Sequence, residues 1–223
     1  MRPAYKDTHT GETIVKYKVA EINEYRQNLQ PLIISEAERL FREKGIKAVT
    51  MEEVSRNLHI SKRTIYELYT NKEEVLIEVL KTVHERKRRH LEEFTRHSNG
   101  IMDVLIEVFR MQLEASVTTN PSFYRDLEKY PQAEALLAQI SASRREASSD
   151  FFARGVKEGD FLPDIDFDVF IRIMSAVEYA IKNNDLLKGI TFKQLLSNYI
   201  RILIRGICTQ QGLQRFDQFF LNS

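Results

Sequence analysis

The stretch of the sequence with the clearest chemical character is residues 60–76, ISKRTIYELYTNKEEVL, whose polar side chains include many hydroxyls and cations. Lysine and arginine neutralise phosphates or donate to base edges, and short hydroxyls donate or accept at the same groups. The side chains able to do this are Ser61, Lys62, Arg63, Thr64 and Tyr66. Because the stretch carries almost no catalytic groups, its composition indicates recognition of a partner rather than a reaction.

Catalytic groups are also scarce in the rest of the chain. The histidines are scattered, with neither an HExxH motif nor a Glu-x-x-His pair, and there is no glycine-rich phosphate loop. The single cysteine, Cys208, excludes an internal disulfide and a CxxC metal knuckle, and we interpret it as a small buried hydrophobe. The sequence therefore predicts a protein that is not an enzyme, with no cofactor and no metal site.

Several signals for the start of a helix lie in or beside the polar stretch, and the helices that they predict must position its side chains. Thr50 and Glu53 are spaced as a capping box, Ser61 is a ready N-cap, and Asn71 precedes Glu74 by the same spacing. An earlier run has apolar residues at helical spacing and ends at a glycine: Ile33, Ile34, Ala37, Leu40, Phe41 and Gly45. This density of start signals predicts a compact bundle of short helices.

The two short helices, expected over residues 50–58 and 61–69 with a tight turn between them, have the dimensions of a helix-turn-helix. In that motif the second helix enters the major groove of DNA, and its first residues meet base edges. Thr50 and Lys72 stand at the starts of two flanking helices, where free backbone N–H groups attract phosphate. This arrangement predicts binding to double-stranded DNA.

The segment IISEAERLFREKGIKAVTMEEVSRNLHISKRTIYELYTNKEEVL, residues 33–76, resembles the DNA-binding domain of the tetracycline-repressor (TetR) family of bacterial transcription regulators. The matching positions, in order and spacing, are Ile33, Ile34, Ala37, Leu40, Phe41, Gly45, Thr50, Val54, Leu58, Ser61, Lys62, Thr64, Tyr66 and Lys72. The resemblance implies phosphate contacts from Thr50, Tyr66 and Lys72. The residues that it implies to face the groove are Lys62, Arg63 and Thr64.

Four positions depart from the family pattern. The turn usually has glycine where this chain has His59, which tolerates a left-handed conformation at some strain. Arg63 replaces a common small residue and adds a group that can read guanine. Glu67 and Leu68 replace frequent aromatic or histidine contacts. We assign neither to DNA, because Glu67 would repel phosphate unless it accepts from a cytosine amino group.

Helical patterns continue to the end of the chain, so we expect an all-α fold of about nine helices. The later helices are expected over residues 101–118, 120–131, 132–157, 167–183 and 191–210. We divide the chain into an N-terminal extension (1–24), a three-helix helix-turn-helix DNA-binding domain (25–85, with the motif at 50–69) and a C-terminal helical effector-binding and dimerisation domain (86–223).

The last two of these helices are candidates for a dimer interface. The helix over residues 167–183 is apolar nearly all round, so the domain can cover one side and a second copy the other. The residues that we assign to this interface are Phe170, Met174, Val177, Leu196, Tyr199 and Leu203. The resemblance likewise implies a four-helix interface between two copies. Two-fold symmetry then places the recognition helices about one DNA turn, ~34 Å, or a multiple of it, apart on a palindromic operator.

Aromatic and methionine residues are frequent in the middle helices, where core filling is their usual role. In a family that senses small molecules between such helices, part of this set lines a pocket. The candidates are Phe94, Phe109, Phe123 and Phe151. An apolar or amphipathic effector there would tilt the helix that begins at Lys72 and change the half-site spacing. The prediction is a homodimeric repressor that a small-molecule effector releases from its operator.

The composition limits the classes of protein to which this chain can belong. A net charge of +1 excludes a broadly basic nucleic-acid coat, no apolar run approaches the ~18 residues of a membrane span, and the cysteine content suits a reducing cytoplasm. The basic run HERKRRH, residues 84–90, lies too far along its helix to share a duplex with Lys72 and is interpreted as a solvated face.

The alternative function is a helical adaptor for protein partners with a vestigial helix-turn-helix. Only DNA binding through several phosphate contacts must weaken steeply as salt rises.

Overall fold

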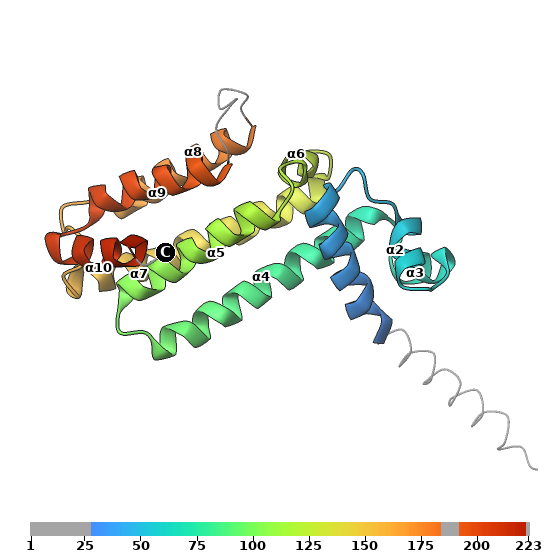
Figure 1. Ribbon diagram of the computed structural model, residues 1–223, viewed down its shortest axis with the longest axis horizontal. Helices are drawn as coiled ribbons and strands as arrows, with labels where there is room; N and C mark the ends of the chain where they lie inside the picture. Colours follow the sequence, from blue (N-terminus) through green and yellow to red (C-terminus); the bar gives the residue numbers. More distant parts are fainter. Residues whose placement is uncertain (1–27, 184–191, 222–223) are drawn as a thin grey trace, which may run out of the picture.

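In the computed structural model, which describes residues 28–183 and 192–221, every regular element is a helix. The first covers residues 28–44 and is drawn in blue in Figure 1. The others are α2 (Met51–Asn57), α3 (Lys62–Leu68), α4 (Lys72–His97), α5 (Ile101–Thr118), α6 (Ser122–Leu127), α7 (Pro131–Lys157), α8 (Phe167–Asn183), α9 (Phe192–Ile207) and α10 (Gln210–Leu221). Within them the side chains of residues 145–147, 178–183, 192–193, 195–196 and 219–221 are outside this description. The all-α prediction is confirmed.

The C-terminal end differs from the prediction. The sequence pattern predicts one helix over residues 191–210, but α9 ends at Ile207 and a separate helix, α10, begins at Gln210. Thr209 begins the new helix, because its Oγ1 accepts a hydrogen bond from the Gly212 N–H at 3.1 Å. The predicted start at residue 191 lies outside the described residues. A threonine N-cap followed by apolar residues at helical spacing is the signal in the sequence that identifies α10.

Two apolar cores lie toward opposite ends of the long helices α4 and α5, which run side by side (Figure 1). The first core joins helix 28–44, α2, α3 and the start of α4 to α6 and the start of α7, through Phe123, Leu127 and Ala133. The second joins α5, the end of α7, α8, α9 and α10. Cys208 is buried in the second core as predicted, and burial raises the pKa of its thiol to about 12.

The three expected N-caps of the helix-turn-helix region are confirmed. In each case the cap side chain accepts a hydrogen bond from the backbone N–H of the residue three positions later. These bonds measure 3.1 Å at Thr50 Oγ1, 3.0 Å at Ser61 Oγ and 3.0 Å at Asn71 Oδ1. The Glu53 carboxylate, however, contacts the Lys44 ammonium instead of returning to the N-cap as a capping box requires. Local signals thus determine where α2, α3 and α4 begin. The side chain of Glu53, the third residue of α2, instead forms an ion pair with a residue of the preceding helix.

Two residues with positive φ shape the connections around these helices. Gly45 ends helix 28–44 at φ +84°, and His59 takes φ +54° in the turn between α2 and α3. Both were expected from the sequence: glycine adopts this conformation without strain, and histidine adopts it at a cost. Gly45 also has a packing role, because a Cβ there would lie 2.9 Å from the Cβ of Ser122 at the start of α6.

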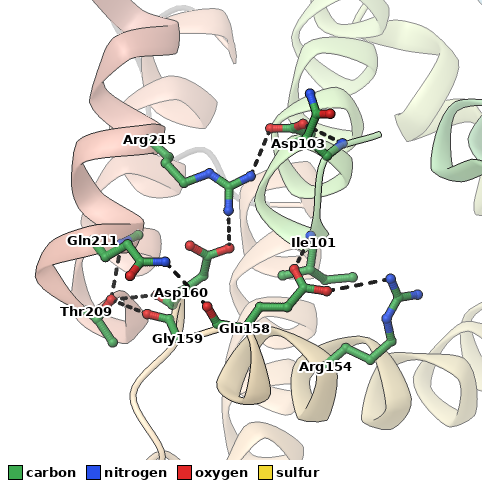
Figure 2. Close-up of polar contacts among 11 residues, drawn as sticks. Ile101, Asp103, Arg154, Glu158, Gly159, Asp160, Thr209, Gln211 and Arg215 are labelled. Carbon is green, nitrogen blue, oxygen red and sulfur yellow. Dashed lines mark hydrogen bonds and ion pairs between the residues drawn. The ribbon is translucent and has the colours of Figure 1, made fainter. Parts of the chain in front are cut away.

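An ion pair between a partly buried arginine and a fully buried carboxylate holds α10 against the turn between α7 and α8 (Figure 2). Arg215 Nη1 donates to Asp160 Oδ2 at 2.8 Å, and Arg215 Nη2 lies 3.3 Å from Asp103 Oδ1 in the first turn of α5. Asp160 is fully buried, and its other carboxylate oxygen has no partner among the described residues. The backbones also touch, since a Cβ on Gly212 would lie 2.2 Å from the Asp160 carbonyl oxygen. One arginine therefore joins three segments that are distant in the sequence.

The start of α5 is capped from α7. Gly100, the residue before α5, has no side chain to serve as a cap. Glu158, just after the end of α7, fills this role, because its Oε2 accepts from the Ile101 N–H at 2.7 Å, and Arg154 lies 3.7 Å from its other oxygen. This contact and the ion pair of Arg215 fix α5, α7 and α10 as one unit.

Candidate nucleic-acid interface

The N-terminal half of α3 carries most of the residues predicted to contact DNA. Ile65 is fully buried in the first core and therefore fixes the rotation of the helix. The opposite face leaves Ser61, Lys62 and Arg63 exposed, together with Tyr66, which is 45% exposed. The structure thus brings these four side chains to one solvent-facing surface.

The two cations of α3 contact their neighbours on the same helix. Arg63 Nε donates to Glu67 Oε1 at 3.0 Å, with 88% of the arginine side chain exposed. The Lys62 ammonium lies over the Tyr66 ring, 5.9 Å from its centroid. Exposed pairs of this kind contribute at most about 1 kcal/mol. They orient the cations along the helix and can be exchanged for contacts with a phosphate or a base.

The hydroxyls of α3 are used partly within the protein. Ser61 Oγ accepts the Thr64 N–H as the N-cap of α3, and the two hydroxyl oxygens are 2.8 Å apart. Thr64 is half-buried, whereas Ser61 is exposed. The first role of Ser61 is therefore to begin the helix, and its exposed side chain also remains accessible to solvent.

Lys72 has a structural role that the sequence does not reveal. Its ammonium donates to the carbonyl oxygens of Ile46 and Val49, both at 2.9 Å, in the turn that leads to the exposed N-cap Thr50. Burial lowers the pKa of Lys72, although the charge of Asp126 opposes this shift. An ammonium has three donors, so one N–H remains for another acceptor. Lys72 thus holds in place the turn that positions Thr50.

The turn after helix 28–44 is also bound to α6. The Lys47 N–H donates to the buried Asp126 Oδ2 at 2.6 Å. The Asn120 N–H donates to the Arg42 carbonyl oxygen at 2.7 Å, and the Asn120 side chain donates to the Glu43 carbonyl oxygen at 3.1 Å. These contacts join α6 to the end of helix 28–44. Sequence reasoning misses them because their partners are more than seventy residues apart.

α4 and α7 are joined in the same region. Glu73, in the first turn of α4, accepts the Gln132 N–H through Oε1 at 2.8 Å and so caps α7. The Tyr130 ring lies 5.8 Å from the Lys72 ammonium. Both residues at the start of α4 therefore contact the segment that leads into α7.

The residues assigned to the dimer interface lie mainly toward the inside of the protomer. Phe170 is buried in the second core; Met174, Tyr199 and Leu203 are half-buried against it, and Tyr199 Oη donates to the Met174 carbonyl oxygen at 3.0 Å. Val177 is half-buried, and the Leu196 side chain lies outside the described residues. Among the described side chains of these two helices, the large apolar residues that are exposed are Val169 (49%), Ile173 (49%) and Ile202 (71%). We call these three the α8–α9 surface.

The four aromatic candidates for an effector pocket lie in different places. Phe109 is buried in the second core and Phe151 packs against it, whereas Phe123 belongs to the first core. Phe94 is half-buried, with its ring centroid 6.4 Å from that of His90. The set therefore does not converge on one point, and helical spacing alone does not distinguish residues that line a cavity from residues that fill a core.

In the described part of the chain, none of the helices combines the length and the apolar character needed to cross a membrane. Residues 33–79 match the family model described as bacterial regulatory proteins, tetR family. The HTH-type transcriptional repressor KstR2 of Mycolicibacterium smegmatis (strain ATCC 700084 / mc(2)155) is 22% identical over 183 residues, which cover 79% of this chain and 89% of that repressor.

Solved structures show a similar fold. The ketosteroid transcriptional regulator KstR2 of Mycobacterium tuberculosis superposes with a TM-score of 0.53 at 20% identity, over 81% of this chain and 95% of the other. A candidate transcriptional regulator from Saccharomonospora viridis, in complex with choline, gives a TM-score of 0.67 at 17% identity, over 82% of this chain and all of the other. The likeness extends well beyond the segment matched by the family model.

Proposed function

Because the chain belongs to the TetR family of bacterial regulatory proteins, which are DNA-binding transcription regulators, we propose that it is a homodimeric repressor released from a palindromic operator by a small-molecule effector. The observation that carries this proposal is the exposed, cationic start of α3, opposite the buried Ile65. In this proposal residues 25–85 form the DNA-binding domain, residues 86–223 bind the effector and dimerise, and the protein acts in the cytoplasm.

At the operator, α3 enters the major groove. Arg63 donates to guanine O6 and N7, and Lys62 and Thr64 face the groove beside it. Tyr66 binds a phosphate oxygen, and the free N–H groups at the starts of α2 and α3, next to Thr50 and Ser61, point toward further phosphates. The Arg63–Glu67 pair presents the guanidinium at the groove-facing side of the helix.

The effector signal reaches α3 through the contacts of α6 and α7. An effector that moves these helices pulls on Asp126 and Glu73, which hold the turn before α2 and the start of α4. A coupling free energy of only about 1–3 kcal/mol gives roughly 5- to 150-fold release. The choline complex of the structurally similar regulator supports a small-molecule effector.

The α8–α9 surface supports dimerisation, since its three large apolar side chains are exposed to between 49% and 71%. We expect Ile202→Glu to make the protein monomeric, because burying an unpaired carboxylate in an apolar interface costs several kcal/mol. Analytical ultracentrifugation measures the oligomeric state of the variant. Val117→Glu is the matched control: Val117 is 64% exposed on α5, outside the proposed interface, and this variant should stay dimeric. A dimeric Ile202→Glu protein would reject the interface.

Selection of bound fragments from a random DNA pool tests the function. We expect an inverted repeat with half-site centres about one helical turn apart, or a multiple of it. The affinity for the selected DNA should fall as salt rises, with a log–log slope of roughly −0.9 per neutralised phosphate. A protein-partner adaptor predicts neither result, so recovery of no motif at low ionic strength would favour that alternative.

A further inference from the structure

α3 carries one carboxylate on the face that the proposed function turns toward DNA. Its sequence, KRTIYEL, contains a single acidic residue, Glu67, whose side chain is 41% exposed. At about 100° per residue, Arg63 and Glu67 both lie roughly 160° around the helix from the buried Ile65. The two side chains therefore share the part of α3 that lies opposite the first core.

A carboxylate in this place opposes the binding of DNA in general. Phosphates repel it, and contacts between cations and phosphates supply most of the affinity that does not depend on sequence. Glu67 instead contacts Arg63, since its Oε1 accepts a hydrogen bond from Arg63 Nε at 3.0 Å. The charges of the two side chains cancel, so the pair adds no net attraction for phosphate.

The hydrogen bond leaves the terminal nitrogens of Arg63 for a base. A guanidinium has five N–H donors, of which Nε carries one and the two terminal nitrogens carry four. Guanine presents two acceptors in the major groove, O6 and N7, and two parallel donors of an arginine bind both. Arg63 can therefore keep its contact with Glu67 while it reads a guanine.

The pair also restrains the direction of the guanidinium. Glu67 lies one turn further along α3 than Arg63, so the ion pair draws the guanidinium away from the start of the helix. The start of α3, next to the N-cap Ser61, is where free N–H groups attract a phosphate. Because 88% of the Arg63 side chain is exposed, little else in the protein limits its rotamers. Without Glu67, the guanidinium can turn toward the phosphate.

We propose that Glu67 is a positioning residue that determines specificity, holding Arg63 ready for a guanine and keeping it from the phosphates. This inference rests on the proposed function and gives Glu67 no contact of its own with DNA. The carboxylate lowers the affinity for all DNA but raises the ratio of operator affinity to non-specific affinity. Specificity is such a difference between affinities, and a repulsive group can increase it.

The test measures base preference by fluorescence anisotropy, with the operator selected from the random pool and with copies changed at single base pairs. Arg63→Ala should remove a guanine preference of roughly 5- to 150-fold at one position of each half-site. Glu67→Ala should reduce the same preference about three- to fivefold, as an exposed ion pair at the upper end of its range would. Random DNA should bind Glu67→Ala more tightly, with a log–log salt slope steeper by roughly 0.9, because Arg63 then neutralises one more phosphate.

Two control variants separate positioning from loss of charge. Glu52 pairs with Arg56 on α2 at the same spacing, and both side chains are exposed, so Glu52→Gln removes a comparable carboxylate from the DNA-binding domain. Its guanine preference should equal that of the wild type. Glu67→Gln keeps an oxygen that can accept from Arg63 Nε, so it should retain more of the preference than Glu67→Ala. An unchanged preference in Glu67→Ala overturns the proposal, and so does an equal loss in either control or an equal loss at every base pair.

A double variant distinguishes positioning from direct reading of a base. When Arg63 is already alanine, Glu67→Ala should change no base preference, because Glu67 acts only through Arg63. A further loss of preference would mean that Glu67 itself accepts from a base, such as a cytosine amino group, and would overturn the proposal. If the wild type selects no DNA motif, the proposed function fails and this inference with it. If a motif is selected and its guanine preference does not depend on Glu67, only this inference fails.

Discussion

Replacing both Lys62 and Arg63 by glutamate is expected to abolish operator binding while the protein stays folded and dimeric. Each lost contact with a base or phosphate costs about 1–3 kcal/mol, and two carboxylates at the groove add repulsion, so the affinity should fall at least about a hundredfold. Neither side chain supports the fold: both are exposed, and their contacts lie within α3. Fluorescence anisotropy with the selected operator measures the loss, and sedimentation checks the dimer.

The matched control makes the same charge change further along α4. Arg88 and Arg89 are exposed cations paired with Glu85, and Arg88 lies roughly 24 Å from Lys72 along the helix. Their double replacement by glutamate should alter operator affinity only slightly at physiological salt, where charges this far apart are screened. Equal losses in both double variants would mean that net charge, and not α3, determines binding. An α3 variant with wild-type affinity would reject α3 as the recognition helix.

Arg215→Ala is expected to lower the free energy of unfolding by about 3–5 kcal/mol, the usual cost of removing one partner from a buried ion pair. The substitution leaves the Asp160 carboxylate fully buried without its cation, and it also removes the contact with Asp103. Since α10 packs against the second core, which also supports α9, the loss should loosen the whole C-terminal unit. Urea unfolding followed by circular dichroism, at one fixed protein concentration, gives the value.

Arg205→Ala is the control for this prediction. Arg205 of α9 pairs with Asp217 of α10, so this ion pair joins two elements, as that of Arg215 does. Here, however, both partners are substantially exposed, Arg205 at 53% and Asp217 at 39%. Exposed pairs are usually worth less than about 1 kcal/mol, so this variant should unfold close to the wild type. If Arg215→Ala lost no more than Arg205→Ala, the ion pair with Asp160 would not be what holds α10.

The sequence by itself determined the helical class and the starts of α2, α3 and α4 around the candidate site. Thr50, Ser61 and Asn71 cap the backbone only three residues further on, and Gly45 and His59 take a conformation set by their own φ. Interactions of this range need no information from the rest of the chain. For the same reason, residues 33–76 could be matched to a family from their spacing alone.

The tertiary structure decided everything that depends on which face of a helix is covered. Helical spacing marks α8 and α9 as apolar, but only packing shows that Phe170 points into the second core while Ile173 and Ile202 are exposed. Only the tertiary structure shows that the Lys72 ammonium donates to two backbone carbonyl oxygens. Such contacts are set when helices pack together, and a periodic pattern read along one helix does not contain its partner.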